Sequence, residues 1–217
     1  MKNLLITGGS RGIGLAIVKS LEQKYNIINI SRSLGELKEF KSVEHYSLDL
    51  SDSENLTKLE NIIKNKKIDV LINNAGGGAH SKIQNISIKK MQEAMNLNLN
   101  SAIILSHLVS KNMIKEKSGQ IINIASIHAL TGNANSSLYS ASKFGLRGFS
   151  EALFYELKKH KIKVTTIYPD LVDTELLPIS FKGRDKILKT ENISSLISYI
   201  LNLPENVLIK DLTISYI

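Results

Sequence analysis

The 217-residue chain contains no cysteine and no tryptophan, and it has only three prolines. Without cysteine it can form no disulfide, no thiolate metal site and no cysteine nucleophile, which fits a reducing compartment. The sequence also lacks any apolar run near the roughly 20 residues of a membrane-spanning helix. Glycines and Arg11 interrupt its first apolar run, so we expect no signal peptide. These absences predict a cytoplasmic protein that does not enter a membrane.

Acidic residues are fewer than basic ones, 20 against 28, and the net charge is +8. The lysines are scattered through segments such as 62–69 and 156–163, and no stretch is rich in arginine or interleaved with aromatic residues. We therefore expect a solvated basic surface and no nucleic-acid partner. A small ligand that carries phosphate also suits this charge. The five histidines show no metal-ligand spacing with carboxylates, so we expect no catalytic metal.

Short apolar segments alternate with longer amphipathic segments along the chain. The expected strands are 3–7, 26–31, 44–50, 69–75, 120–126, 163–169 and 211–217. The expected helices are 13–24, 53–64, 87–115, 139–159 and 191–203. Strands that alternate with helices of this length form βαβ units with right-handed crossovers. We predict an α/β fold, one domain over residues 1–217, with a Rossmann-type, doubly wound parallel sheet and helices on both faces.

Two local patterns support particular helices. Ser51 followed by Glu54 is typical of a capping box before the second helix. In the fourth helix, Phe144, Phe149 and Leu153 have the spacing of an apolar stripe. We therefore expect Ser51 to cap one helix and the three apolar residues to face the core from the other.

The first expected strand leads into a glycine-rich turn and then an amphipathic helix. Gly8 allows a tight turn, Gly12 lets the backbone approach a pyrophosphate, and Gly14 permits close packing of helix on strand. The helix N-terminus attracts the anion. This context predicts a dinucleotide site built from Gly8, Gly9, Ser10, Arg11, Gly12, Ile13 and Gly14.

The end of the second expected strand selects between the two nicotinamide dinucleotides. A carboxylate at this position bonds the adenosine ribose hydroxyls and selects NAD. This chain has Ser31 and Arg32 there instead, and Arg11 lies in the glycine-rich turn. Two arginines near the ribose 2′ position favour a bidentate contact with a 2′-phosphate. The sequence therefore favours NADP(H) over NAD(H).

A tyrosine four residues before a lysine occurs twice in the fourth expected helix. Tyr139 precedes Lys143, and Tyr155 precedes Lys159; each tyrosine also has a serine thirteen positions before it. The serine of the second set, Ser142, lies in the same helix as Tyr155, so the two are about 20 Å apart along its axis. They cannot contact one substrate, and we exclude the second set from catalysis.

The serine of the first set, Ser126, ends an expected strand, and Tyr139 begins the helix that follows. Both therefore belong at the carboxyl edge of the sheet, where doubly wound folds bind ligands. We expect Tyr139 to act as general acid in carbonyl reduction, with Lys143 lowering its pKa and Ser126 stabilising the substrate oxygen.

The sequence resembles the short-chain dehydrogenase/reductase family over about four-fifths of its length. The matching residues, in family order, are 7–14, Asp49 with Leu50, 73–76, Asn98, Ser126, Tyr139 with Lys143, and 169–174. The resemblance implies a seven-stranded Rossmann sheet, hydride transfer between a nicotinamide and a carbonyl or alcohol, and assembly as a homodimer or homotetramer. One departure is Asp170, which stands where the family usually has glycine.

The resemblance also implies roles for single residues. The implied cofactor contacts are Asp49 and Leu50 at the adenine, Asn74, Ala75 and Gly76 at the ribose side, Pro169, Val172 and Thr174 near the nicotinamide, and Lys143 at the nicotinamide ribose. Asn98 would hold a proton-relay water, with Asn96 and Asn100 as neighbouring alternatives.

We predict an NADP(H)-dependent reductase that acts on a small ketone or aldehyde. The alternative is an NADP(H)-binding regulatory or scaffold protein without turnover. Residues 176–190 are expected to form a substrate-binding loop. His128, two residues after Ser126, is expected to line the pocket rather than to act in catalysis.

Overall fold

The computed structural model describes residues 1–78, 80–177 and 180–217. Its seven strands form one parallel sheet in the order β3-β2-β1-β4-β5-β6-β7. The strands are β1 (Lys2–Thr7), β2 (Tyr25–Ser31), β3 (Val43–Ser47), β4 (Val70–Asn73), β5 (Gly119–Ile124), β6 (Ile162–Pro169) and β7 (Asp211–Ile214). The predicted doubly wound parallel sheet is confirmed. Its strand order reverses between β1 and β4, and such a switch point opens a crevice at the carboxyl ends of the strands.

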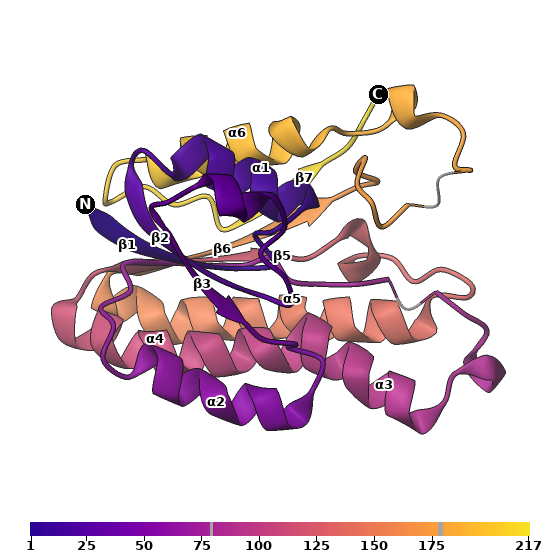
Figure 1. The fold of residues 1–217 in the computed structure, drawn as a ribbon, viewed down its shortest axis with the longest axis horizontal. Coiled ribbons are helices and arrows are strands. Elements are labelled where there is room, and N and C mark those ends of the chain that lie inside the picture. The colour runs from indigo at the N-terminus through magenta and orange to yellow at the C-terminus, as the bar shows by residue number, and fades with distance from the viewer. Residues whose placement is uncertain (79, 178–179) are drawn as a thin grey trace.

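Helices cover both faces of the sheet, as Figure 1 shows. The helices α1 (Gly12–Leu21) and α6 (Thr190–Leu201) pack together on one face. The opposite face is covered by α2 (Ser53–Ile63), α4 (Ser101–Glu116) and α5 (Ser137–Leu157), with α3 (Ile88–Met95) continuing beyond them. Within the described ranges, no helix is long and apolar enough to cross a bilayer.

The sheet is buried on both faces, as parallel sheets usually are. Side chains alternate along each strand, so Leu4 and Ile6 pack with the residues of α1 and α6, whereas Leu5 packs with those of α2 and α4. Two separate apolar clusters therefore hold the helices against the sheet. This arrangement fixes the carboxyl ends of β1, β2, β4 and β5, which carry most of the predicted site.

Two local expectations were wrong. Asp52, not Ser51, caps α2: its side chain accepts a hydrogen bond from the Glu54 N–H, while the Ser51 hydroxyl donates to Asp49. Asp at the cap position is as favourable as Ser, and it lies one residue closer to the helix. Phe144 does not face the core, because it lies on the outer side of α5 and is 42% exposed.

Candidate active site

The glycine-rich turn between β1 and α1 can be built only with glycine at its bends. Gly8 and Gly12 have φ angles of 69° and 54°, in the left-handed region that disfavours other residues. A Cβ on Gly14 would lie 2.1 Å from the Gly8 carbonyl oxygen. The residue before α1, Arg11, makes no side-chain cap. The first N–H groups of α1 are therefore left for an anionic ligand.

Asn29 of β2 holds the glycine-rich turn through a hydrogen bond, a role that the sequence did not predict. Its side chain is fully buried, and its Oδ1 accepts a 2.8 Å hydrogen bond from the Gly9 N–H. Its Nδ2 donates to the Ser31 hydroxyl and lies 2.9 Å from Nδ1 of His45. Gly9 thus anchors the turn to β2, and it is not among the residues that line the cavity described below. A polar residue inside the apolar strand 26–31 was the available signal.

Thr7, the last residue of β1, joins the turn to the end of β4. Its hydroxyl accepts hydrogen bonds from the N–H groups of Asn74, at 3.1 Å, and Ala75, at 2.9 Å. The Asn74 side chain donates in return to the carbonyl oxygens of Thr7 and Gly8. These bonds hold the two sides of the crevice at a fixed separation.

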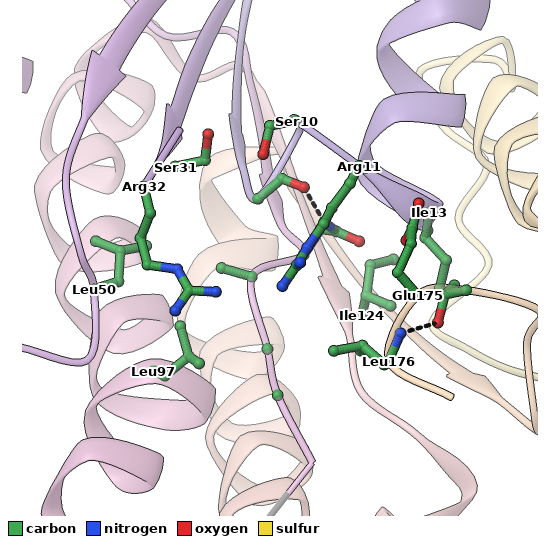
Figure 2. A pocket seen from close by; sticks show the side chains of 18 of the residues that line it. Ser10, Arg11, Ile13, Ser31, Arg32, Leu50, Leu97, Ile124, Glu175 and Leu176 are labelled. Atoms are coloured by element: carbon green, nitrogen blue, oxygen red, sulfur yellow. Dashed lines mark hydrogen bonds between the residues drawn. The ribbon is translucent and has the colours of Figure 1, made fainter. Parts of the chain in front are cut away.

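A cavity of about 350 Å³ lies over the turn and the ends of these strands (Figure 2). Its lining contains the predicted residues Gly8, Ser10, Arg11, Gly12, Ile13, Gly14, Ser31, Arg32, Asp49, Leu50, Asn74, Ala75, Gly76, Tyr139, Lys143 and Thr174. Arg11 and Arg32 extend into it from opposite sides. Pro169 and Val172 do not line it; Val172 is buried and bridges to Leu188.

Two of the residues that line the cavity, Asp49 and Arg32, carry opposite charges. Burial opposes ionisation of Asp49, but hydrogen bonds from the N–H and hydroxyl of Ser51, and the charge of Arg32, outweigh it and lower the Asp49 pKa. Asp49 is therefore ionised at neutral pH. Because its carboxylate is held by Ser51, the guanidinium of Arg32 remains available to a ligand on its cavity side.

Tyr139 and Lys143 line the cavity, and Ser126, which is not among its lining residues, is hydrogen-bonded to Tyr139. The Lys143 ammonium lies 5.8 Å from the centre of the Tyr139 ring and donates to the Ile124 carbonyl oxygen at 3.0 Å. Lys143 is only 3% exposed, and burial lowers its pKa from 10.5 to about 8. Burial raises the pKa of Tyr139, and a hydrogen bond from Ser126 offsets part of that rise.

The expectation that Lys143 lowers the Tyr139 pKa is therefore not met in this geometry. Removing the phenol from water disfavours the phenolate more than its polar neighbours favour it. The consequence is that Tyr139 holds its proton at neutral pH. This is the state that a proton donor needs.

Asn98 lies behind the cavity, in a π-helical turn, Asn96–Asn100, that joins α3 to α4. Sequence periodicity predicted one uninterrupted helix over 87–115. Asn98 is 2% exposed; its Oδ1 accepts from the Gly77 N–H at 2.9 Å, and its Nδ2 donates to the Gly77 carbonyl. Asn96 bonds Ser51 instead, and Asn100 bonds Asn96. Of the three asparagines, Asn98 is the one that contacts the strand ends at the site.

The second tyrosine–lysine pair lies far from this site. Tyr155 is 54% exposed, and the ammonium groups of Lys158 and Lys210 lie 5.0 and 5.4 Å from its ring centre. Ser142 is buried within the same helix and donates to the Tyr139 carbonyl oxygen. This second set has no access to the cavity.

Comparisons with known proteins agree with this geometry. The sequence model of the family described as short chain dehydrogenase matches residues 2–184. A 3-oxoacyl-(acyl-carrier-protein) reductase, FabG, from Buchnera aphidicola is 37% identical over 183 residues, or 80% of this chain and 74% of the relative.

The chain belongs to the short-chain dehydrogenase/reductase family.

Solved structures of the family superpose over nearly the whole chain. A serine dehydrogenase complexed with NADP⁺ has a TM-score of 0.86 at 26% identity and covers 98% of this chain and 94% of its own. A 4-hydroxyisoleucine dehydrogenase complexed with NADH has a TM-score of 0.90 at 26% identity, covering 99% and 97%. This short-chain dehydrogenase/reductase is therefore an oxidoreductase with a nicotinamide cofactor site.

A segment after β6 closes one side of this dehydrogenase/reductase's cavity. Glu175 and Leu176 line the cavity, although sequence reasoning missed Glu175. Asp173 holds the base of the segment through salt bridges to Arg184 and, at 3.0 Å, to Lys189. Part of the predicted substrate-binding loop 176–190, residues 178 and 179, lies outside the described residues.

Proposed function

We propose that the protein reduces a ketone or aldehyde to an alcohol with NADPH and that Tyr139 donates the proton. The observation that carries the proposal is the meeting of Ser126, Tyr139 and Lys143 beside the glycine-rich cavity. The cofactor supplies the hydride when it is bound. The chain itself binds and orients the two reactants and supplies the proton.

Tyr139 and Ser126 have separate tasks at the substrate oxygen. Tyr139 keeps its proton at neutral pH and gives it to the oxygen as the carbonyl is reduced. The Ser126 hydroxyl stabilises the negative charge that develops on the same oxygen. Lys143 and the backbone of Gly76 lie near each other, since a Cβ on Gly76 would lie 3.5 Å from the Lys143 ammonium. Asn98 positions that backbone by holding Gly77 at both its N–H and its carbonyl.

The preference for NADP(H) is supported by charge. Arg11 and Arg32 reach into the cavity, and Ser31 occupies the position where a carboxylate would select NAD. The relatives described above include one structure with NADP⁺ and one with NADH, so the family accommodates both. The choice in this chain rests on the two guanidinium groups, which suit a 2′-phosphate.

The proposal is tested with purified protein, NADPH or NADH, and a panel of small ketones, diketones and aldehydes. We expect turnover with NADPH, a reduction of at least about 100-fold in Tyr139→Phe, and little change in the matched control Tyr155→Phe. Arg32→Ala should weaken NADPH binding by about tenfold while affecting NADH much less. Full activity in Tyr139→Phe would refute the mechanism. Tight NADPH binding without turnover of any compound would instead support a regulatory or scaffold protein.

We also propose that the protein forms a homodimer or homotetramer. The support is the exposed side of α5, where Phe144 and Tyr155 are 42% and 54% exposed. Apolar side chains exposed on one helix favour pairing with a second copy. Light scattering on wild type and Phe144→Glu measures this directly, and a monomeric wild type contradicts it.

A further inference from the structure

Two histidines pack against the Tyr139 ring. The ring centre of His80 lies 5.1 Å from that of Tyr139, and the ring centre of His128 lies 5.3 Å from it. The two imidazole centres are 5.7 Å apart. The three rings come from the segment after β4, the short helix Ile127–Ala129 after β5, and the start of α5. Three separate parts of the chain thus form one cluster of rings.

Each imidazole is oriented by a serine. Nδ1 of His80 lies 2.8 Å from the Ser136 hydroxyl, and Nδ1 of His128 lies 3.4 Å from the Ser140 hydroxyl. Both serines are buried, so these contacts hold the rings in place. Within the described residues neither Nε2 has a hydrogen-bond partner. Each histidine therefore offers its second ring nitrogen to a ligand.

The backbone keeps this pair beside the reacting atoms. The Ser81 N–H donates to the Asn135 carbonyl at 2.7 Å, which ties the His80 segment to the residues before α5. The His128 N–H donates to the Ser126 hydroxyl at 3.2 Å. His80 is exposed and His128 is partly buried, so the pair lies at the entrance to the site.

Distances and donor type indicate what the pair binds. Two neighbouring N–H donors match the two oxygens of a carboxylate better than a single acceptor atom. Both imidazoles pack against the Tyr139 ring, so a group bound at the histidines lies next to a carbonyl that accepts a proton from Tyr139. We propose that His80 and His128 bind a carboxylate on the substrate and that the substrate is a short oxo acid. This inference rests on the reductase function proposed above.

Charge around the pair makes the interaction depend on pH. Burial and the neighbouring His80 lower the pKa of His128, while Asp170 raises it. Lys143 is a further charged group, 5.8 Å from the Tyr139 ring of the cluster. A bound carboxylate adds negative charge next to the His128 imidazole and so favours its protonated form. Oxo-acid binding therefore takes up a proton and weakens as the pH rises through the range of histidine titration.

The experiment compares acetoacetate and levulinate with their methyl esters, using the holoenzyme with NADPH. We expect kcat/KM at pH 6 to be at least about tenfold higher for the acid than for its ester, with the advantage shrinking by pH 8. Equal values for acid and ester at pH 6 overturn the inference while leaving the reductase function standing. Absence of turnover with all four compounds, together with the wider ketone panel, overturns both.

Variants separate binding from a structural role. His80→Ala and His128→Ala should each raise KM for the acid about tenfold, and for the ester far less. His80→Gln and His128→Gln keep an amide donor near the Nε2 position, so acid binding returns in part. His128→Gln cannot take up a proton, so in this variant the binding also loses its pH dependence. His107→Ala, at an exposed position on α4, is the matched control and should leave KM unchanged for both the acid and the ester. If the alanine variants raise both KM values equally, the pair does not recognise a carboxylate.

Discussion

Replacing Lys143 by methionine should make the cofactor-free protein more stable while abolishing its activity. The Lys143 side chain is 3% exposed, and burial lowers its pKa from 10.5 to about 8. At about 1.36 kcal/mol per pKa unit, keeping the ammonium charged in this site costs roughly 3 kcal/mol. Methionine has a similar length and no charge, so the variant escapes this cost.

One interaction is lost in exchange. The Ile124 carbonyl oxygen, which accepts the 3.0 Å bond from Lys143, is left without this donor, at a cost of about 1 kcal/mol. We therefore expect Lys143→Met to raise the free energy of unfolding by about 2 kcal/mol at pH 7. Activity is lost because the substitution removes one member of the Ser126, Tyr139 and Lys143 set that is proposed to carry the reaction.

The pH dependence identifies the cause. Below pH 8, folded and unfolded chains both carry the charged lysine, and the full cost is present. Between about pH 8 and 10.5 the folded chain loses this proton first, so the unfolded state binds more protons and wild-type stability rises with pH. The advantage of Lys143→Met should therefore disappear by about pH 9.5.

Urea unfolding, followed by circular dichroism at pH 7, 8.5 and 9.5, measures the difference between the two proteins and cancels the contributions that they share. Lys159→Met is the matched control, because Lys159 is exposed in the short 3-10 helix Lys158–His160 that follows α5, and its replacement should change stability by less than about 0.5 kcal/mol. A variant less stable than wild type at pH 7, or an advantage independent of pH, would refute the reasoning.

Three further predictions concern other parts of the site. Asn29→Ala removes the acceptor of the Gly9 N–H and should weaken NADPH binding about tenfold in a fluorescence titration, whereas exposed Asn26→Ala should not. Asp173→Asn breaks two salt bridges and should speed amide hydrogen exchange over residues 184–189; unchanged exchange contradicts the anchoring role. In the cofactor-free protein, the ultraviolet phenolate signal that distinguishes wild type from Tyr139→Phe should appear only above pH 10, since burial raises this pKa.

The fold and the centre of the site could be predicted because both depend on local pattern. Alternating strands and helices of ordinary length leave few topologies, and those put strand ends and helix starts on one edge of the sheet. That placement predicted that Ser126 lies near Tyr139, and it excluded Tyr155 from the active site. In the structure Tyr155 lies on the outer surface. The family resemblance then agreed with residues already chosen on geometric grounds.

What sequence reasoning missed depends on tertiary partners. Asn29 and His80 belong to no local motif, and their importance comes from what the fold places beside them: Gly9 for one, Tyr139 for the other. The pKa of Tyr139 was expected to fall because the nearby lysine is visible in the sequence, whereas the depth of burial that raises it is not. The cap at Asp52 and the exposure of Phe144 each differ from the expectation by about one position along a helix. Sequence periodicity does not locate helix ends and faces to a single residue.

The π-helical turn Asn96–Asn100 has a consequence for insertions and deletions in the gene. Such a turn holds one residue more than an α-helical turn, so removing a single codon here would leave a regular helix. Each residue of an α-helix turns it by about 100°, so everything after the deletion would rotate by that amount. Leu105, Val109 and Met113 would leave the sheet that they cover. This stretch should therefore tolerate no change in length.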